Sequence, residues 1–171
     1  LVTPEMLLPE NAACLRLPGT DGKAKMSKSL GNCIYLSDTS KEIKKKVNSM
    51  YTDPEHLQIT DPGHVEGNVV FTYLDAFSTP ELFAKFLPEY ADLDEMKDHY
   101  RRGGLGDGTC KKFLFNIMED FLQPMRERRK QYEQNIPQVY EILRKGSEAA
   151  RAEAAKTLAD VRKAMKIDYF D

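Results

Sequence analysis

Residues 113–125 read Phe-Leu-Phe-Asn-Ile-Met-Glu-Asp-Phe-Leu-Gln-Pro-Met. Their apolar side chains recur every three or four residues, which is the period of one buried helix face. The side chains expected on this face are Phe113, Leu114, Ile117, Met118, Phe121, Leu122 and Met125. We expect Asp107 to cap this helix, the longest in the chain. We expect Pro124 to bend it, because proline lacks a backbone donor.

Similar helical patterns occupy most of the chain after residue 37. Two further apolar faces are Val69, Val70, Tyr73, Leu74 and Phe77, and then Leu82, Phe83, Phe86 and Leu87. Helix starts are predicted at Thr39 with Glu42, Asp53-Pro54, Thr79-Pro80, Asp92 with Glu95, Pro137 and Ser147. These places carry capping boxes, a capping side chain before proline, or a cap alone. Glycine is expected to end helices at Gly103-Gly104 and at Gly146.

The fold class is therefore predicted to be mainly α. Residues 37–171 are expected to form an antiparallel helical bundle with short loops. Residues 1–36, rich in glycine, proline, lysine and serine, are expected to form a separate part. The last helix carries only a narrow stripe of Leu158, Val161 and Met165. We expect this stripe to pack on a part of the protein that is absent from this chain.

Charge is unevenly distributed along the chain, although the formal net charge is only -2. Residues 23–46 carry seven basic and two acidic side chains, and residues 101–130 carry eight and four. Residues 81–100 carry two basic and six acidic side chains. Such segregation creates local potentials that attract polyanions. The alternative is that charged helices simply keep these side chains in water.

The cysteine, histidine and hydropathy patterns argue against a zinc protein, a disulfide-stabilised protein and a membrane protein. Cys14, Cys33 and Cys110 lie far apart and form no Cys-x-x-Cys pair, so no zinc site or disulfide framework is predicted. The three histidines, His56, His64 and His99, are expected to be surface or capping residues. No apolar run approaches the roughly 20 residues of a membrane span, and no signal peptide is recognised. We therefore expect a cytoplasmic protein.

Residues 19–32 carry the chemistry-bearing pattern, Gly-Thr-Asp-Gly-Lys-Ala-Lys-Met-Ser-Lys-Ser-Leu-Gly-Asn. Three lysines supply point charges that suit phosphate oxygens, and Ser27 and Ser29 supply hydroxyl donors. Glycines at both ends let the backbone turn and move. Such a loop is suited to folding over a polyphosphate, although composition alone equally fits a solvated basic loop.

The ordered residues Lys25-Met26-Ser27-Lys28-Ser29 are identical to the KMSKS signature of class I aminoacyl-tRNA synthetases. Residues 61–71 resemble the stretch that follows this loop in bacterial-type tryptophanyl-tRNA synthetases. Residues 110–114 and 121–129 resemble that family's C-terminal helix. Three matches in the right order cover most of the chain, which therefore resembles the C-terminal part of that family.

The resemblance implies a reaction and roles for individual residues. The family activates tryptophan with ATP and transfers it from tryptophanyl-adenylate to tRNA(Trp). Lys25 and Lys28 would be the catalytic residues, because they would stabilise charge on the departing pyrophosphate. The implied ATP-binding residues are Leu17, Lys25, Met26, Ser27, Lys28 and Ser29. Magnesium is implied as the counter-ion of ATP, with no protein-bound metal site in this chain.

The helical part is implied to face the tRNA anticodon. Its candidate tRNA-binding residues are Lys111, Lys112, Arg126, Arg128, Arg129 and Lys130. Phosphate contacts from such residues supply affinity. The resemblance also implies a homodimer in the full-length enzyme and no membrane partner.

The family's His-x-Gly-His-type motif and Rossmann-like strand and helix alternation are missing from these residues. We therefore expect residues 1–36 to be a strip of the catalytic domain, and tryptophan to be bound through the missing half. This chain alone is expected to be inactive. The alternatives are a tyrosyl-tRNA synthetase fragment, a non-catalytic helical RNA-binding module, or a helical protein-interaction bundle.

Overall fold

The computed structural model describes residues 2–169, and its regular elements are helical. A short 3-10 helix, η1 (Ala12–Cys14), precedes six α-helices. These are α1 (Ser40–Asn48), α2 (Val69–Phe77), α3 (Pro80–Phe86), α4 (Leu93–Arg102), α5 (Asp107–Glu133) and α6 (Ile136–Met165). Within residues 2–169 there is no strand, only an isolated bridge between Pro18 and Lys25. The prediction of a mainly α fold is confirmed.

The chain separates into two compact units. The larger unit spans Leu7–Arg126, and the smaller one contains the residues up to Met6 and those from Glu127 onward. The predicted division into residues 1–36 and 37–171 stays a prediction. The larger unit holds the loop of residues 19–32 together with α1 to α4, so this loop rests on a helical body.

The core of the larger unit is built around α2 and α5. In α2, Val70 and Leu74 are fully buried, and in α5 Leu114 is fully buried. The rings of Phe83 in α3 and Phe113 in α5 pack with centroids 4.5 Å apart. The predicted apolar faces are therefore largely confirmed. The exception is Phe121, which is 48% exposed and contacts Phe77 at the edge of the core.

Two predicted helix starts are formed by the expected side chains. At α1, Thr39 and Glu42 form a reciprocal capping box. At α4, the Asp92 carboxylate accepts from the Glu95 amide. The Glu95 carboxylate accepts from the amide of Ala91 rather than from that of Asp92. Thr79 precedes Pro80 at the start of α3 as predicted, although its side chain makes no capping hydrogen bond.

The predicted helix after Asp53-Pro54 is wrong. Residues 51–68 form turns and loops, and Asp53 holds this segment together. Its carboxylate accepts from the amide of Glu55 at 2.9 Å and from the amide of His64 at 2.7 Å. A short acidic side chain before proline can stabilise a turn as well as a helix, and the local pattern does not distinguish them.

Asp107 and His56 also differ from expectation. Asp107 is the first residue of α5 rather than its cap, and its carboxylate accepts from the Tyr100 hydroxyl at 2.7 Å. His56 is buried, not on the surface, with its ring centroid 4.6 Å from that of Tyr100. Its Nδ1 atom lies 3.6 Å from the Asp107 carboxylate. Asp107 is therefore used in a buried polar cluster, which is a non-local arrangement.

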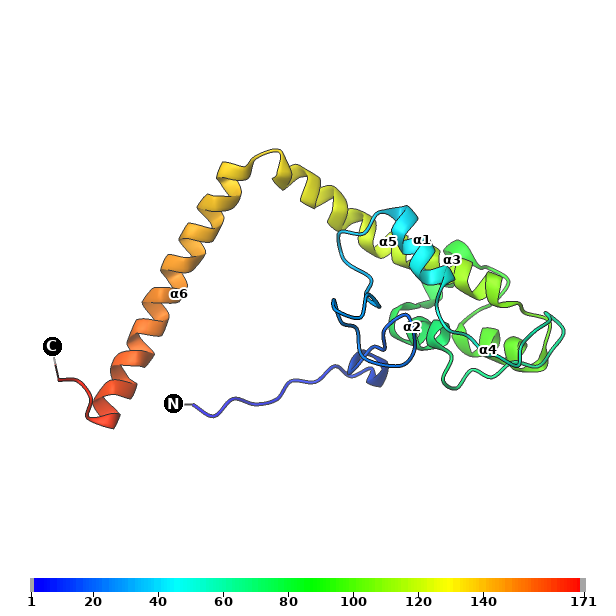
Figure 1. Cartoon of the computed structure of the whole chain (residues 1–171), viewed down its shortest axis with the longest axis horizontal. Helices are drawn as coiled ribbons and strands as arrows, with labels where there is room; N and C mark the ends of the chain where they lie inside the picture. Colours follow the sequence, from blue (N-terminus) through cyan, green and yellow to red (C-terminus); the bar gives the residue numbers. More distant parts are fainter. Residues whose placement is uncertain (1, 170–171) are drawn as a thin grey trace. The chain divides into compact units, whose positions relative to one another are not determined.

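The helix end predicted at Gly146 is wrong. Helix α6 is one uninterrupted helix in Figure 1, and its range, Ile136–Met165, includes Gly146 and Ser147. A mid-helix glycine weakens a helix by only about 1 kcal/mol relative to alanine, and alanine-rich residues follow it. Pro124 lies inside α5, which continues to Glu133, and the bend predicted there stays a prediction. Helix α6 buries none of its residues, and Leu158 and Met165 are 48% and 63% exposed.

Over residues 2–169, no helix combines the length and apolar character that a membrane crossing requires.

Two glycine-to-alanine substitutions are expected to have opposite effects. Gly103 has a φ of +82°, and a Cβ there would lie 2.3 Å from the carbonyl oxygen of Thr60, so Gly103→Ala should destabilise the larger unit by more than about 1 kcal/mol. Gly146→Ala meets no atom within 4 Å and should stabilise α6 by about 1 kcal/mol. Chemical denaturation followed by circular dichroism measures both, and shifts of the same sign would contradict the structure.

Stability should also depend on the pair of His64 and Asp53. A hydrogen bond to the Asp53 carboxylate raises the pKa of His64 above its ordinary value of 6.5. The protonated imidazole therefore stabilises the fold fully below pH 6.5, and this stabilisation is lost as pH rises through the raised pKa. The thermal midpoint should fall over that window in the parent chain and fall less in His64→Gln. Identical pH profiles for the two proteins would refute the role of this pair.

Candidate functional site

The two ends of the loop of residues 19–32 are joined by main-chain hydrogen bonds. The amide of Gly19 donates to the carbonyl of Ala24 at 2.7 Å, and Pro18 forms a bridge with Lys25. At the other end, the amide of Thr20 donates to the carbonyl of Asn32 at 3.0 Å. The loop is therefore closed at its base by main-chain hydrogen bonds.

The buried side chain of Asn32 occupies the inside of this loop. Its Oδ1 atom accepts from the amide of Ser27 at 2.8 Å. Its Nδ2 atom donates to the Asp21 carboxylate at 3.1 Å and to the Lys25 carbonyl at 3.4 Å. The hydrogen bond from Asn32 lowers the pKa of Asp21, which stays ionised as an acceptor.

The predicted ATP-binding residues lie together on this loop or just before it. Lys25, Lys28 and Ser29 are exposed, whereas Ser27 is half-buried. Met26 and Leu17 are half-buried and pack against the core. The hydroxyls of Ser27 and Ser29 are hydrogen-bonded at 2.9 Å. The loop therefore presents two ammonium groups and a hydroxyl pair outward, while Met26 packs against the body and Leu30 is 60% exposed.

The charges of the two signature lysines are not neutralised nearby. In the part of the chain that the structure describes, neither Lys25 nor Lys28 forms an ion pair. A lysine without a partner retains its full attraction for an incoming anion. This loop is accordingly suited to contact a polyphosphate.

Two contacts anchor the loop base to the helical body. The Tyr73 hydroxyl in α2 donates to the carbonyl of Pro18 at 2.7 Å. Burial raises the pKa of Tyr73 to about 12, so the phenol keeps the proton that it donates. The amide of Tyr51 donates to the carbonyl of Thr20 at 3.3 Å. The position of the loop therefore depends on α2 and on the segment that follows α1.

The segment after the loop is tied to α1 and α5 by a charged network. The buried Asp38 carboxylate accepts from the Lys46 ammonium at 2.5 Å and from the amide of Tyr35 at 2.8 Å. Arg126 in α5 donates to the carbonyl of Asp38 at 3.4 Å and pairs with Glu119 at 2.8 Å. Arg126 is thus already engaged in a structural contact.

The other candidate tRNA-binding residues differ in their surroundings. Lys111 donates to the carbonyl of Asn48 at 3.0 Å. Arg129 pairs with Glu133 and Lys130 pairs with Glu127, within 3 Å in each case and on an exposed helix surface. Lys112 and Arg128 are exposed, and neither is in an ion pair among residues 2–169. These two have the least compensated charge of the set.

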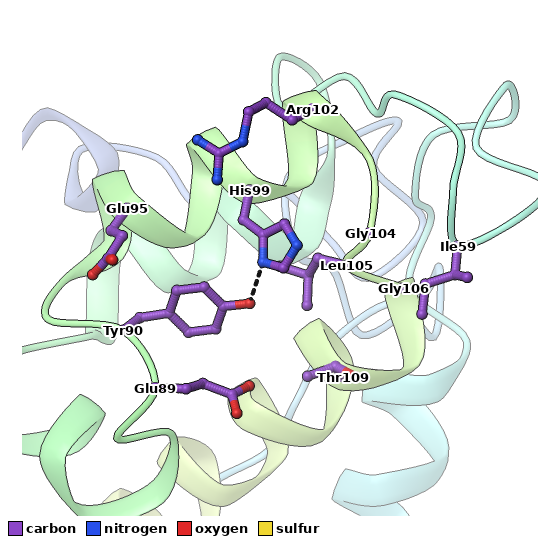
Figure 2. A pocket seen from close by; sticks show the side chains of 10 residues that line it. All are labelled: Ile59, Glu89, Tyr90, Glu95, His99, Arg102, Gly104, Leu105, Gly106 and Thr109. Atoms are coloured by element: carbon purple, nitrogen blue, oxygen red, sulfur yellow. Dashed lines mark hydrogen bonds between the residues drawn. The ribbon is translucent and has the colours of Figure 1, made fainter.

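A separate hollow of about 470 Å³ lies between the end of α4 and the start of α5. Figure 2 shows the hydrogen bond in its lining between the Tyr90 hydroxyl and Nδ1 of His99, at 2.6 Å. Glu89, Glu95 and Arg102 give its lining mixed charge. Such a hollow lacks the positive character of the loop, and no candidate residue from the sequence lies in its lining.

No three His, Cys, Asp or Glu side chains gather into a possible metal site within residues 2–169. Near the loop, the donors are mainly ammonium groups and hydroxyls, which suit phosphate oxygens rather than a metal ion.

The sequence reasoning did not recognise Asn32 or Tyr73 as site residues. Asn32 was visible only as the last residue of the loop pattern, and Tyr73 only as a member of an apolar helix face. Both act through hydrogen bonds to distant residues. A polar residue at the end of a functional loop, and a tyrosine on a buried face, are the signals that could have identified them.

Comparisons with known proteins identify the family of this chain. A family model described as "tRNA synthetases class I (W and Y)" matches residues 1–123. The tryptophan–tRNA ligase of Streptococcus pyogenes serotype M3 is 54% identical over 170 residues, 99% of this chain and 48% of the relative. That of Clostridium longisporum is 54% identical over 171 residues, 100% of this chain and 47% of the relative.

A solved structure of a relative also shares the fold. It is the tryptophanyl-tRNA synthetase of Campylobacter jejuni, complexed with ADP and tryptophane. The TM-score is 0.68 at 26% identity, over 88% of this chain and 43% of that one. The chain thus spans about half the length of the curated relatives it matches. These relatives are tryptophan ligases, which disfavours the tyrosyl alternative.

The match of the family model includes the whole loop and most of the helical body, so the signature is not a chance likeness. This chain belongs to the class I tRNA synthetases of the tryptophan and tyrosine group.

Proposed function

We propose that this chain is the ATP-loop and tRNA-facing part of a tryptophan–tRNA ligase that acts in the cytoplasm. The observation that carries this proposal is the loop itself, in which Lys25 and Lys28 are exposed and form no ion pair within residues 2–169. The Asn32 side chain holds this loop together. Tryptophan specificity comes from the relatives, which are named as tryptophan ligases. The amino acid itself would be bound by the half of the enzyme that this chain does not span.

The loop lysines would act on the phosphates of ATP. In the reaction, the tryptophan carboxylate attacks the α-phosphorus, and the bond to pyrophosphate breaks. Negative charge then increases on the departing pyrophosphate. Lys25 and Lys28 would stabilise this charge, and Ser27 and Ser29 would donate hydrogen bonds. Magnesium, supplied with ATP, would neutralise further phosphate charge.

The helical part would bind tRNA(Trp), to which the tryptophanyl group is transferred. Lys112 and Arg128 are the strongest candidates for phosphate contacts, because their charges are not paired in the described part of the chain. Lys111, Arg126, Arg129 and Lys130 would contribute less, since each already holds a partner. The full-length enzyme is proposed to be a homodimer, as in the family.

The first test uses a full-length hybrid ligase, in which residues 1–171 replace the matching half of the Streptococcus pyogenes relative. Lys25→Ala and Lys28→Ala should each lower kcat for ATP–pyrophosphate exchange by roughly 100-fold or more, the effect of losing one preorganised charge-stabilising group. Lys44→Ala, on the exposed side of α1, is the matched control and should leave kcat unchanged. The chain of residues 1–171 alone should show no exchange.

Unchanged kcat in both loop variants would refute the assigned role of the lysines. Exchange by residues 1–171 alone would refute the expectation that the other half is required.

The second test measures tRNA binding by the hybrid ligase over a series of salt concentrations. Lys112→Ala and Arg128→Ala should each weaken binding and reduce the slope of log K against log salt by about 0.7 to 0.9, because each removes one phosphate contact. Lys163→Ala, an exposed residue of α6, serves as the control. A slope that neither Lys112→Ala nor Arg128→Ala changes would place the tRNA contacts elsewhere.

A further inference from the structure

The Asn32 amide connects three separate points of the loop. Its Oδ1 atom accepts a hydrogen bond from the Ser27 amide. Its Nδ2 atom donates to the Asp21 carboxylate and to the carbonyl of Lys25. These partners lie five, eleven and seven residues before it in the chain. One buried side chain therefore determines where the backbone of the signature lies relative to the start of the loop.

The surroundings of Asn32 are shaped to hold this amide. Asn32 is only 3% exposed, so water does not compete for its hydrogen bonds. A Cβ at Gly19 would lie 2.1 Å from the Asn32 Nδ2 atom, so only glycine leaves room for the amide at that place. The main-chain carbonyl of Asn32 also accepts from Thr20, which closes the same turn.

The backbone atoms that Asn32 holds belong to Lys25 and to Ser27, on both sides of Met26. The side chain of Lys25 is exposed, and so is that of Lys28, one residue beyond Ser27. A lysine on a long flexible stem reaches a phosphate efficiently only if its backbone is at the right distance. Errors of about 1 Å in such placement reduce rates on the order of 100-fold.

We propose that Asn32 is a positioning residue for adenylate formation, which holds the loop backbone so that the two lysines reach the phosphates of ATP. This inference rests on the proposed function of the loop. Asn32 itself touches neither ATP nor tryptophan in this role. It acts through the hydrogen bonds to Ser27, Lys25 and Asp21.

The experiment compares Asn32→Ala and Asn32→Asp in the hybrid ligase. Asn32→Asp keeps the size of the side chain and the acceptor for the Ser27 amide. However, it places a carboxylate next to the Asp21 carboxylate and next to the Lys25 carbonyl. Both variants should lower kcat for ATP–pyrophosphate exchange by on the order of 10- to 100-fold. The KM for tryptophan and the fraction of active sites that form adenylate should stay near those of the parent enzyme.

A compensating double variant makes the test specific. In Asn32→Asp combined with Asp21→Asn, the amide and the carboxylate exchange places, so the hydrogen bond between the two positions is restored. The double variant should recover part of the kcat that Asn32→Asp loses, because the carboxylate at position 32 still faces the Lys25 carbonyl. Hydrogen exchange of the Ser27 amide, measured by mass spectrometry or NMR, should be faster in Asn32→Ala than in the parent protein.

Asn116→Ala is the matched control, because Asn116 in α5 is half-buried and its side chain makes no hydrogen bond within the described part of the chain. Parental kcat in Asn32→Ala, alongside a large loss in Lys28→Ala, would overturn the positioning role alone. Parental kcat in both would overturn the proposed function of the loop as well. If the loss of kcat in Asn32→Ala is fully explained by a lower fraction of active sites, the positioning role is also overturned, because the variant then lowers only the amount of folded enzyme.

Discussion

The burial of α2 is the constraint on which the larger unit depends. Val69, Val70, Phe71, Tyr73 and Leu74 are all buried, so this helix has almost no exposed apolar face and must be surrounded. Helix α4 contacts it, and Phe71 packs edge-on against Tyr100 of that helix. The hydroxyl of Tyr73 extends from the core to the carbonyl of Pro18. Burial of one apolar helix therefore also fixes the base of the functional loop.

Local patterns were sufficient to predict most helices, because each pattern refers to neighbouring residues. The capping box of Thr39 and Glu42 involves residues three apart, and the apolar period of α5 repeats within one helix. The predictions failed where a side chain has a distant partner or no decisive local preference. Asp53 binds His64 eleven residues away, and Asp107 binds Tyr100, so neither caps a helix. Gly146 lies in open space, where its small helical penalty is outweighed by the alanine-rich residues that follow.

The candidate site was predictable to the same extent. The signature lysines and serines form one continuous stretch, so their grouping was readable from the sequence. The hydrogen bonds that hold the loop in place were not readable in this way. They come from Asn32, Asp21 and Tyr73, and the sequence pattern does not link these residues to the signature. Likewise, counting charges identified a basic α5, but it could not show that Arg126 is held by Glu119 and by the carbonyl of Asp38. Which basic residues keep free charge is a property of packing.

The hydrogen bonds of the loop fall into two kinds, and the difference bears on how such a loop works. Those of Asn32 join loop residues to one another, so they persist when the loop moves as a body. Those from Tyr73 to Pro18 and from Tyr51 to Thr20 join the loop base to the helical body. Loop closure over a substrate excludes water and completes a catalytic site, yet flexible side chains lose precision when their backbone also flexes. A loop held together by its own hydrogen bonds reconciles the two needs, because it can move as one body while Asn32 keeps the Lys25 and Ser27 backbones in place relative to each other.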